Sequence, residues 1–166
     1  MKKCLILAAL IFPVFGLFSG CSNRAQEEQR YEIKAQGLGK LIAQQASACV
    51  SQSKAYQAVW EYAKVSEMDF ETAAAQMLGS ETRQNKAMMV EHKSMIEDLL
   101  EELEDPPSQF EGTYEKLVEL HEIYVKLHDL AMDPSDDMDD HMKSVNKLSA
   151  QILEKTRELD ATFVMR

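Results

Sequence analysis

Proline and glycine are rare in this chain after residue 22, and this scarcity constrains the fold more than any other feature. Three prolines follow that residue, at only two places, Pro106–Pro107 and Pro134. Proline cannot occupy a helix interior without breaking it, so long helices are expected between these places. Within the longest interval, Gly79 precedes the polar run 80–86, which predicts a break or kink in the second helix.

The first helix is predicted from a heptad pattern that starts after Gly37. Residues at the a and d positions are apolar or small, which predicts a helix face that packs against other helices. The only tryptophan of the chain lies at the end of this face and is expected in the core. These positions are Ile42, Ala46, Cys49, Ser53, Tyr56, Trp60 and Ala63. Ser66 and Asp69 have the spacing of a helix-capping box at the turn that follows.

Helical spacing continues through the rest of the chain. The second helix is expected to bury Phe70, Ala73, Ala74, Met77 and Leu78, and then Met88, His92, Met95, Leu99 and Leu103. A capping box at Ser108 and Glu111 predicts the start of the third helix, and Asp133–Pro134 the start of the fourth. Short loops between long helices place neighbours antiparallel, so we predict an all-α, antiparallel up-down four-helix bundle.

The first 22 residues resemble a bacterial lipoprotein signal peptide that ends in a lipobox. Lys2 and Lys3 precede an apolar run, and small residues come directly before Cys21. Phe18 stands where such boxes usually carry Leu. The resemblance implies a signal peptide over 1–20, a lipidated Cys21 with a flexible tether over 21–37, and a bundle domain over 38–166. The protein would then be lipid-anchored on the extracytoplasmic side of a bacterial membrane, or on the periplasmic face if there are two membranes.

An uncleaved membrane anchor is the alternative for this segment. Pro13 and Gly16 interrupt an apolar run that is shorter than the ~20 residues of a spanning helix, which disfavours it.

The net charge limits which partners the protein is expected to bind, and the cysteine content limits which covalent links it is expected to form. The chain has a net charge of −10, which disfavours nucleic acid and anionic lipid surfaces. Acyl chains on Cys21 would therefore be the main membrane contact. Cys49 would be left as a single unpaired thiol, expected to be a small buried residue without a disulfide role.

A wider pattern of core and cap positions resembles a group of small, uncharacterised bacterial lipoproteins. The residues that carry the resemblance are Trp60, Asp69–Phe70, Pro106–Pro107, Tyr114, Leu117, Tyr124, Leu127, Ala131 and Pro134–Ser135. It covers about residues 59–159 and implies a helical domain behind a lipobox. Asp136–Asp137 stands where that group often has Gly-Ser. The group supplies no catalytic residues.

Four histidines are the first candidates for chemistry, but none has the spacing of a known site. His121 and His128 are seven apart, too far for one ion on a single helix, and Glu-x-x-His motifs of di-iron bundles are absent. Met89 with His92 and Met138 with His141 have spacings compatible with soft-metal or haem ligation, but methionine is more often core filler.

The other chemical motifs are also missing. The aspartates at 136–140 lack the glycine and glutamate of a calcium loop, and no nucleophile motif or phosphate-binding loop occurs. No enzymatic activity, catalytic residue, metal ligand or cofactor is therefore predicted, and His141 is expected to be a surface residue.

Acidic residues crowd the end of the second helix, from Glu97 to Asp105, where the helix dipole disfavours them. Either a basic partner or lysines such as Lys116 would relieve the repulsion. The leading functional hypothesis is a non-enzymatic helical interaction module for another envelope protein. Two alternatives remain: a metal or haem carrier around His92, His121 and Tyr124, or a holder of hydrophobic ligands or unfolded clients.

Overall fold

The protein is all-α, as the sequence predicted. A computed structural model describes residues 19–134 and 137–164, and every regular element in these ranges is helical. The elements are α1 (Ser19–Val65), α2 (Phe70–Met77), α3 (Ser80–Glu101), the 3-10 turn η1 (Ser108–Phe110), α4 (Glu111–Met132) and α5 (Met138–Val164). None of the described helices combines the length and the apolar character needed to cross a membrane.

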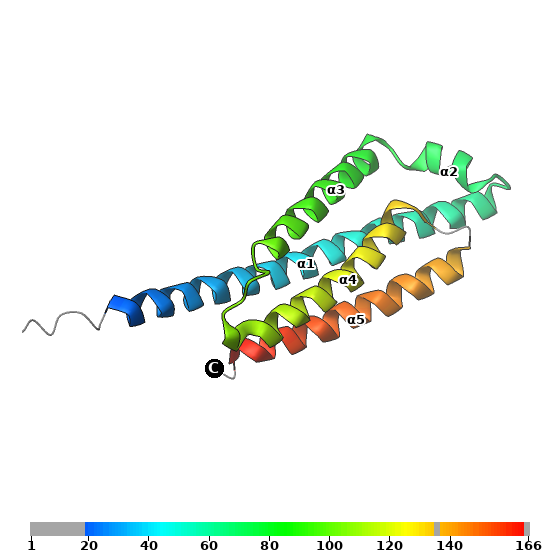
Figure 1. Cartoon of the computed structure of the whole chain (residues 1–166). Helices are drawn as coiled ribbons and strands as arrows, with labels where there is room; N and C mark the ends of the chain where they lie inside the picture. Colours follow the sequence, from blue (N-terminus) through cyan, green and yellow to red (C-terminus); the bar gives the residue numbers. More distant parts are fainter. Residues whose placement is uncertain (1–18, 135–136, 165–166) are drawn as a thin grey trace, which may run out of the picture.

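Three helices, α1, α4 and α5, form the centre of the molecule. Each of them packs against the other two, whereas α3 contacts α1 and α4 less extensively. Figure 1 shows α3 lying close to α1 at its C-terminal end and diverging from it towards α2. The element expected as one second helix is therefore an arm of two helices, α2 and α3, that leans on a three-helix core.

The heptad pattern of α1 correctly predicts its buried face. Ile42, Ala46, Cys49, Ser53, Tyr56 and Ala63 are all buried. Trp60 is only half-buried, because Val59, one position earlier, takes the fully buried place near the end of the helix. Trp60 instead packs its ring against Phe70 of α2, with ring centroids 4.7 Å apart.

The expected flexible tether over 21–37 is wrong for its second half. The helix α1 runs without a break from Ser19, and Tyr31 and Ala35 belong to the core. The hydroxyl of Tyr31 donates a hydrogen bond to the carbonyl of Leu103 at 3.2 Å, and its ring packs on Phe110. Burial of this apolar face against the ends of α3 and α4 stabilises helix in a stretch that looks polar in sequence.

Gly39 is part of this continuous helix and does not interrupt it. A Cβ at this position would lie 2.5 Å from Cδ2 of Leu159, a buried residue of α5. The missing side chain therefore lets α5 approach α1 closely. Gly37, by contrast, has no atom within 4 Å of its Cβ direction.

The predicted break at Gly79 is confirmed, since α2 ends at Met77 and α3 begins at Ser80. The expected cap at Ser66 is wrong. Asp69 is the N-cap of α2, and its carboxylate accepts hydrogen bonds from the backbone N–H and the hydroxyl of Thr72, at 2.8 and 2.9 Å. Asp69 is able to cap because its backbone is extended while the next residue is already helical.

The buried face of α3 differs in part from the expected one. Met89 and Ile96 enter the core, whereas Met88 and Met95 are 42% and 43% exposed. Leu103, just after the end of α3, is buried as expected. Both sets of residues have helical spacing, so periodicity alone does not distinguish them. The contact with α1 and α4 selects the set that starts one residue later.

Two predicted helix starts are displaced. Ser108 begins the short η1 rather than a capped α-helix, and α4 follows it from Glu111 with no side-chain hydrogen bond at its cap. The helix α5 begins at Met138 instead of Asp133–Pro134, and the Asp137 carboxylate accepts a hydrogen bond from the N–H of Asp140 at 2.8 Å. Asp137 thus supplies the acid that the sequence analysis expected at Asp133.

The inward faces of α4 and α5 carry the rest of the core. Fully buried side chains recur at helical spacing on both helices and complete the core with α1. They are Leu117, Leu120, Tyr124 and Leu127 on α4, and Val145, Ile152 and Leu159 on α5.

Candidate binding groove

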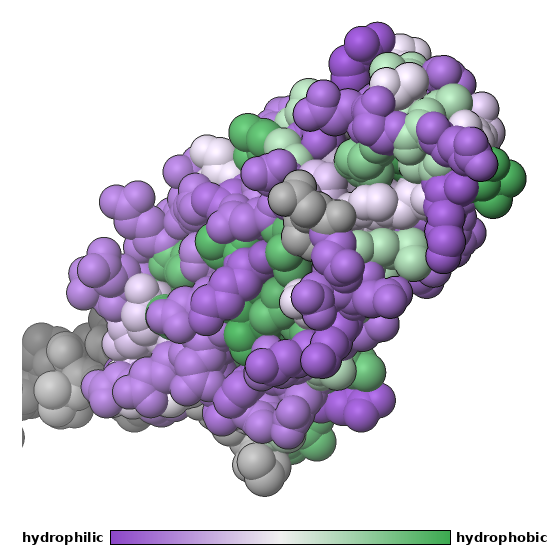
Figure 2. Space-filling view, turned by 90° about the vertical axis from the view of Figure 1, so that its right-hand side faces the viewer, coloured by the Kyte–Doolittle hydropathy of each residue, from purple (hydrophilic) through white to green (hydrophobic). Residues whose placement is uncertain are grey.

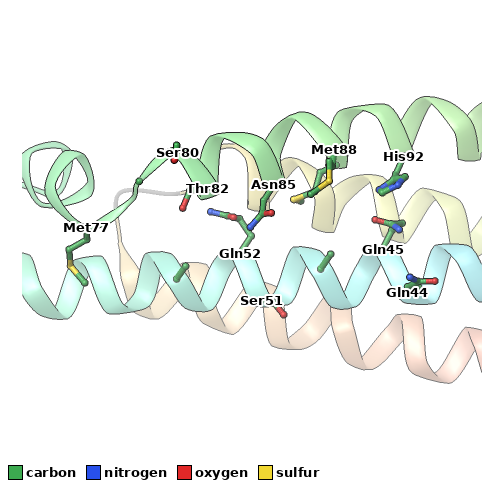
Figure 3. Close-up of a pocket in the computed structure, with 14 residues that line it drawn as sticks. Gln44, Gln45, Ser51, Gln52, Met77, Ser80, Thr82, Asn85, Met88 and His92 are labelled. Carbon is green, nitrogen blue, oxygen red and sulfur yellow. The ribbon is translucent and has the colours of Figure 1, made fainter.

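A groove of about 900 Å³ lies between α1 and the arm formed by α2 and α3. It is located where α3 diverges from α1, and Figure 3 shows side chains from both helices projecting into it. The polar and sulfur-containing residues that line it are Gln44, Gln45, Ser51 and Gln52 of α1, and Met77, Ser80, Thr82, Asn85, Met88, Met89 and His92 of the arm with its connection.

The lining is uncharged although the protein is strongly acidic. Among the described lining residues there is no aspartate, glutamate, lysine or arginine, while the whole chain has 28 acidic and 18 basic residues. Carboxamides, hydroxyls and thioethers predominate instead. Such a surface forms hydrogen bonds and dispersion contacts without requiring a charged partner.

Gln52 is the most informative residue of the groove. Its side chain is 5% exposed, and its Nε2 is buried without a hydrogen-bond partner among the described residues. A buried amide N–H without an acceptor costs about 1–3 kcal/mol. In Figure 3 the Gln52 side chain points from α1 towards α3, so an acceptor within the groove would satisfy this donor.

Lys86 attaches α3 to α4 and α1 of the core. Its Nζ donates a hydrogen bond to the carbonyl of Met132 at 2.8 Å, at the C-terminus of α4, and lies 5.3 Å from the centroid of the Tyr56 ring. A cation is favoured at a helix C-terminus by the helix dipole. At the far end of the arm, the Tyr62 hydroxyl donates to Oε1 of Gln76 at 3.2 Å. These polar contacts add to the apolar packing of α2 and α3 on the core.

The candidate histidines are not brought together. His92 lines the groove, while His121 and His128 lie on α4 on either side of Tyr124, with ring centroids 6.4 and 6.0 Å from it. Burial lowers the pKa of His121 and outweighs the nearby Glu97 carboxylate. In residues 19–134 and 137–164, no group of three or more histidine, cysteine or acidic side chains is placed to hold a metal ion.

The expectation that His141 lies on the surface is wrong. Its side chain is 1% exposed, and its ring packs against Trp60 and Tyr56, with centroid distances of 5.3 and 6.3 Å. The later start of α5 places His141 one turn before Val145, on the face that enters the core. Desolvation lowers the pKa of this imidazole.

Cys49 is buried, as expected for a small core residue. Its burial raises the pKa of the thiol to about 12, so the reactive thiolate is disfavoured at neutral pH. Cys21 lies within α1, but its side chain, like the whole of residues 1–18, lies outside the described part of the chain.

The crowded acidic end of α3 is relieved by other lysines than expected. Lys34 of α1 forms an ion pair with Glu102 at 2.7 Å, and Lys93 pairs with Glu97 at 2.6 Å. Lys116, the expected partner, lies 3.9 Å from Glu158 of α5 instead. Lysines of the same chain therefore compensate the acidic charge, and they belong to α1 and α3. Lys34 is able to do so because the N-terminal half of α1 passes beside the C-terminal end of α3.

The sequence analysis did not identify the groove. A usable signal was present, because Gln45 and Gln52 are seven residues apart beside the apolar face of α1 and are both buried. Buried carboxamides at heptad spacing indicate that a helix face is covered by something other than an apolar neighbour.

No protein-family model, curated protein or solved structure matches this chain.

Proposed function

We propose that this chain is a lipoprotein anchored through Cys21 on the extracytoplasmic side of a bacterial membrane, and that its domain is a non-enzymatic binding module. In this proposal the domain is an up-down four-helix bundle whose second helix is divided into α2 and α3. The module binds another envelope protein through the groove between α1 and the arm. The pattern of Met1 to Ser22 supports the anchor.

The single observation that carries the binding role is the unpartnered Nε2 of Gln52 inside the groove. Folding alone gives no reason to keep a buried carboxamide whose N–H groups lack acceptors, because an apolar side chain of similar size would be more stable there. A ligand that supplies an acceptor restores the lost hydrogen bond. The groove is therefore built for an occupant rather than for stability.

A polypeptide segment fits the lining better than other ligands. The carboxamides of Gln44, Gln45, Gln52 and Asn85 both donate and accept, as a peptide backbone does. Met77 and Met88 supply flexible apolar contacts that adapt to irregular side chains. Among the described lining residues there is no phenylalanine, tyrosine or tryptophan to stack on a sugar ring, and the acidic character of the whole protein disfavours a strongly acidic segment.

Site-specific photo-crosslinking in cells tests this proposal. A photoreactive amino acid is placed at Gln44 or Ser80, both exposed at the groove, and at Asn146 on the exposed face of α5 as the control. We expect the two groove positions to capture the same protein, and the control position to capture none of it. Adding Gln52→Leu should reduce the captured amount, because the donor is removed.

Two outcomes would contradict the proposal. Recovery of the monomer alone, under conditions that capture a known envelope complex, would remove the binding role. Equal capture from the groove and from Asn146 would show that the contact is unspecific.

A further inference from the structure

Two exposed methionines flank a histidine on one face of α3. Met88 and Met95 are 42% and 43% exposed, and His92 lies between them, four residues after the first and three before the second. Met89 and Ile96 supply the core contacts of this helix instead. Met88 and Met95 are therefore not core filler, which is the ordinary role of methionine in a helical protein.

Helical geometry places His92 next to both methionines, while Met88 and Met95 are seven residues apart. A methionine side chain has three rotatable bonds and reaches further than an imidazole, so both sulfurs can approach an ion held at His92, which two imidazoles at that spacing could not do. Residues three and four apart on a helix are neighbours, with Cβ atoms about 5–6 Å apart. Side chains lean towards the N-terminus, so Met95 reaches back towards His92, and His92 towards Met88. Figure 3 shows Met88 and His92 on the groove side of α3. Met95 lies one turn further along.

The donor set is soft. Two thioether sulfurs and one imidazole nitrogen are typical ligands of Cu(I), whereas Mg²⁺ and Ca²⁺ require oxygen ligands. His92 has no hydrogen bond or ion pair with the described residues that would compete for its ring nitrogens. The exposed Glu91 lies next to His92 on the solvent side, where its negative charge favours a cation.

We propose that Met88, His92 and Met95 form a binding site for one Cu(I) ion on the surface of α3. The site goes beyond the binding of a polypeptide in the groove and does not depend on it. It shares Met88 and His92 with the lining of the groove but needs no bound polypeptide. It also differs from a site in the bundle interior, because the three ligands belong to one face of α3 and His121 takes no part.

Titration of the full chain in detergent tests the site. Ag(I) serves as a redox-inert probe, and Cu(I) is added without oxygen and in competition with a coloured Cu(I) chelator. We expect one bound ion per chain. The double variant M88L/M95L keeps the side-chain volumes and removes both sulfurs, so its affinity should fall at least tenfold. His92→Phe should cause a similar loss.

Met142→Leu is the matched control, because Met142 is a half-buried methionine on α5, away from this face. The Met142→Leu variant should bind Ag(I) with the same affinity as the unchanged protein. NMR signals of the methionine methyl groups add a direct readout: those of Met88 and Met95 should shift with one equivalent of Ag(I), and that of Met142 should not.

Absence of a bound ion, or an affinity of M88L/M95L within twofold of the unchanged protein, would overturn the proposal. Circular dichroism of each variant separates loss of binding from loss of folding. Because Met88 and Met95 are exposed, the double variant should unfold at nearly the same urea concentration as the unchanged protein. The crosslinking experiment in the groove does not use a metal, so the two proposals fail separately.

Discussion

Gln52 and His141 are buried polar side chains whose nitrogens lack partners among the described residues. They differ in their surroundings. Gln52 faces a groove that a ligand can enter, whereas His141 is enclosed by the rings of Tyr56 and Trp60. The first is the basis of the proposed binding role, and the second is expected to make stability depend on pH.

Replacement of Gln52 by methionine should stabilise the protein. The variant removes a buried amide without an acceptor and keeps a flexible side chain of similar length, so we expect the free energy of unfolding to rise by about 1 kcal/mol. Urea unfolding at neutral pH measures the change. A loss of more than about 1 kcal/mol would mean that the Gln52 amide is satisfied within the folded domain.

Stability should fall as the pH is lowered from 7.5 to 5.5. Burial places the pKa of His141 and of His121 below the ordinary value of 6.5. The unfolded chain therefore binds more protons than the folded chain in this interval, so the free energy of unfolding rises with pH and is lost as pH falls.

His141→Phe isolates the contribution of this ring. Phenylalanine keeps the packing on Tyr56 and Trp60 but does not titrate, so the difference in unfolding free energy between pH 7.5 and 5.5 should become smaller. Lys143→Ala, on the exposed side of α5, serves as the control. An unchanged difference in His141→Phe would show that other groups cause the pH dependence.

Among the secondary-structure elements, α1 and α3 show what the sequence can and cannot predict. The heptads of α1 identify its buried face because Ile42, Cys49 and Tyr56 exclude any other apolar face. On α3, two sets of residues with helical spacing overlap. Which set is buried depends on how α3 packs against its neighbours, and the local sequence does not specify this packing.

Helix boundaries are harder to predict than the buried face of α1, because they too depend on contacts between segments far apart in the chain. The polar residues before Gly37 gave no sign of a core contact, because only Tyr31 and Ala35 enter the core there, and their partners lie about 70 residues away in the chain. The Gly79 break was accessible because a glycine followed by a polar run acts locally. The shape of the groove depends on the angle between two helices, which the sequence does not specify; the heptad-spaced Gln45 and Gln52 indicate only the side of α1 on which it lies.

Two glycines in α1 should respond in opposite ways to alanine. Gly37→Ala should raise the free energy of unfolding by about 0.5–1 kcal/mol, since alanine favours helix and nothing lies within 4 Å of its Cβ. Gly39→Ala should lower it by about 1 kcal/mol, because the new Cβ forces the buried Leu159 to move in a packed core. Urea unfolding of the two variants measures both changes. Equal gains in the free energy of unfolding would mean that Leu159 moves without cost.

At the scale of the whole molecule, the surface is mostly hydrophilic on the face that Figure 2 presents, with several apolar patches between polar residues. The acidity of the chain disfavours contact of the domain with an anionic bilayer. In the proposed location, the lipid on Cys21 is therefore the membrane contact.

Cys21→Ala should abolish incorporation of a labelled fatty acid and release the domain from the membrane fraction, without changing its unfolding in urea. The core begins ten residues later, at Tyr31, which is why folding should be unaffected. Cys49→Ala is the control for labelling, because the buried thiol should carry no lipid. Labelled fatty acid on Cys21→Ala would refute the proposed anchor.

The N-terminal part of α1 extends beyond the other helices and continues into the core without a break (Figure 1). With Cys21 acylated, the orientation of the groove about the membrane normal is then set by helical phase, since each residue turns a helix by about 100° and advances it by about 1.5 Å. One alanine inserted between Gln26 and Glu27 would turn the groove away from a partner fixed in the same membrane. Seven inserted residues would nearly restore its azimuth, at a height about 10 Å greater. Capture from the groove positions should therefore follow the periodicity of the helix rather than the length of the insert.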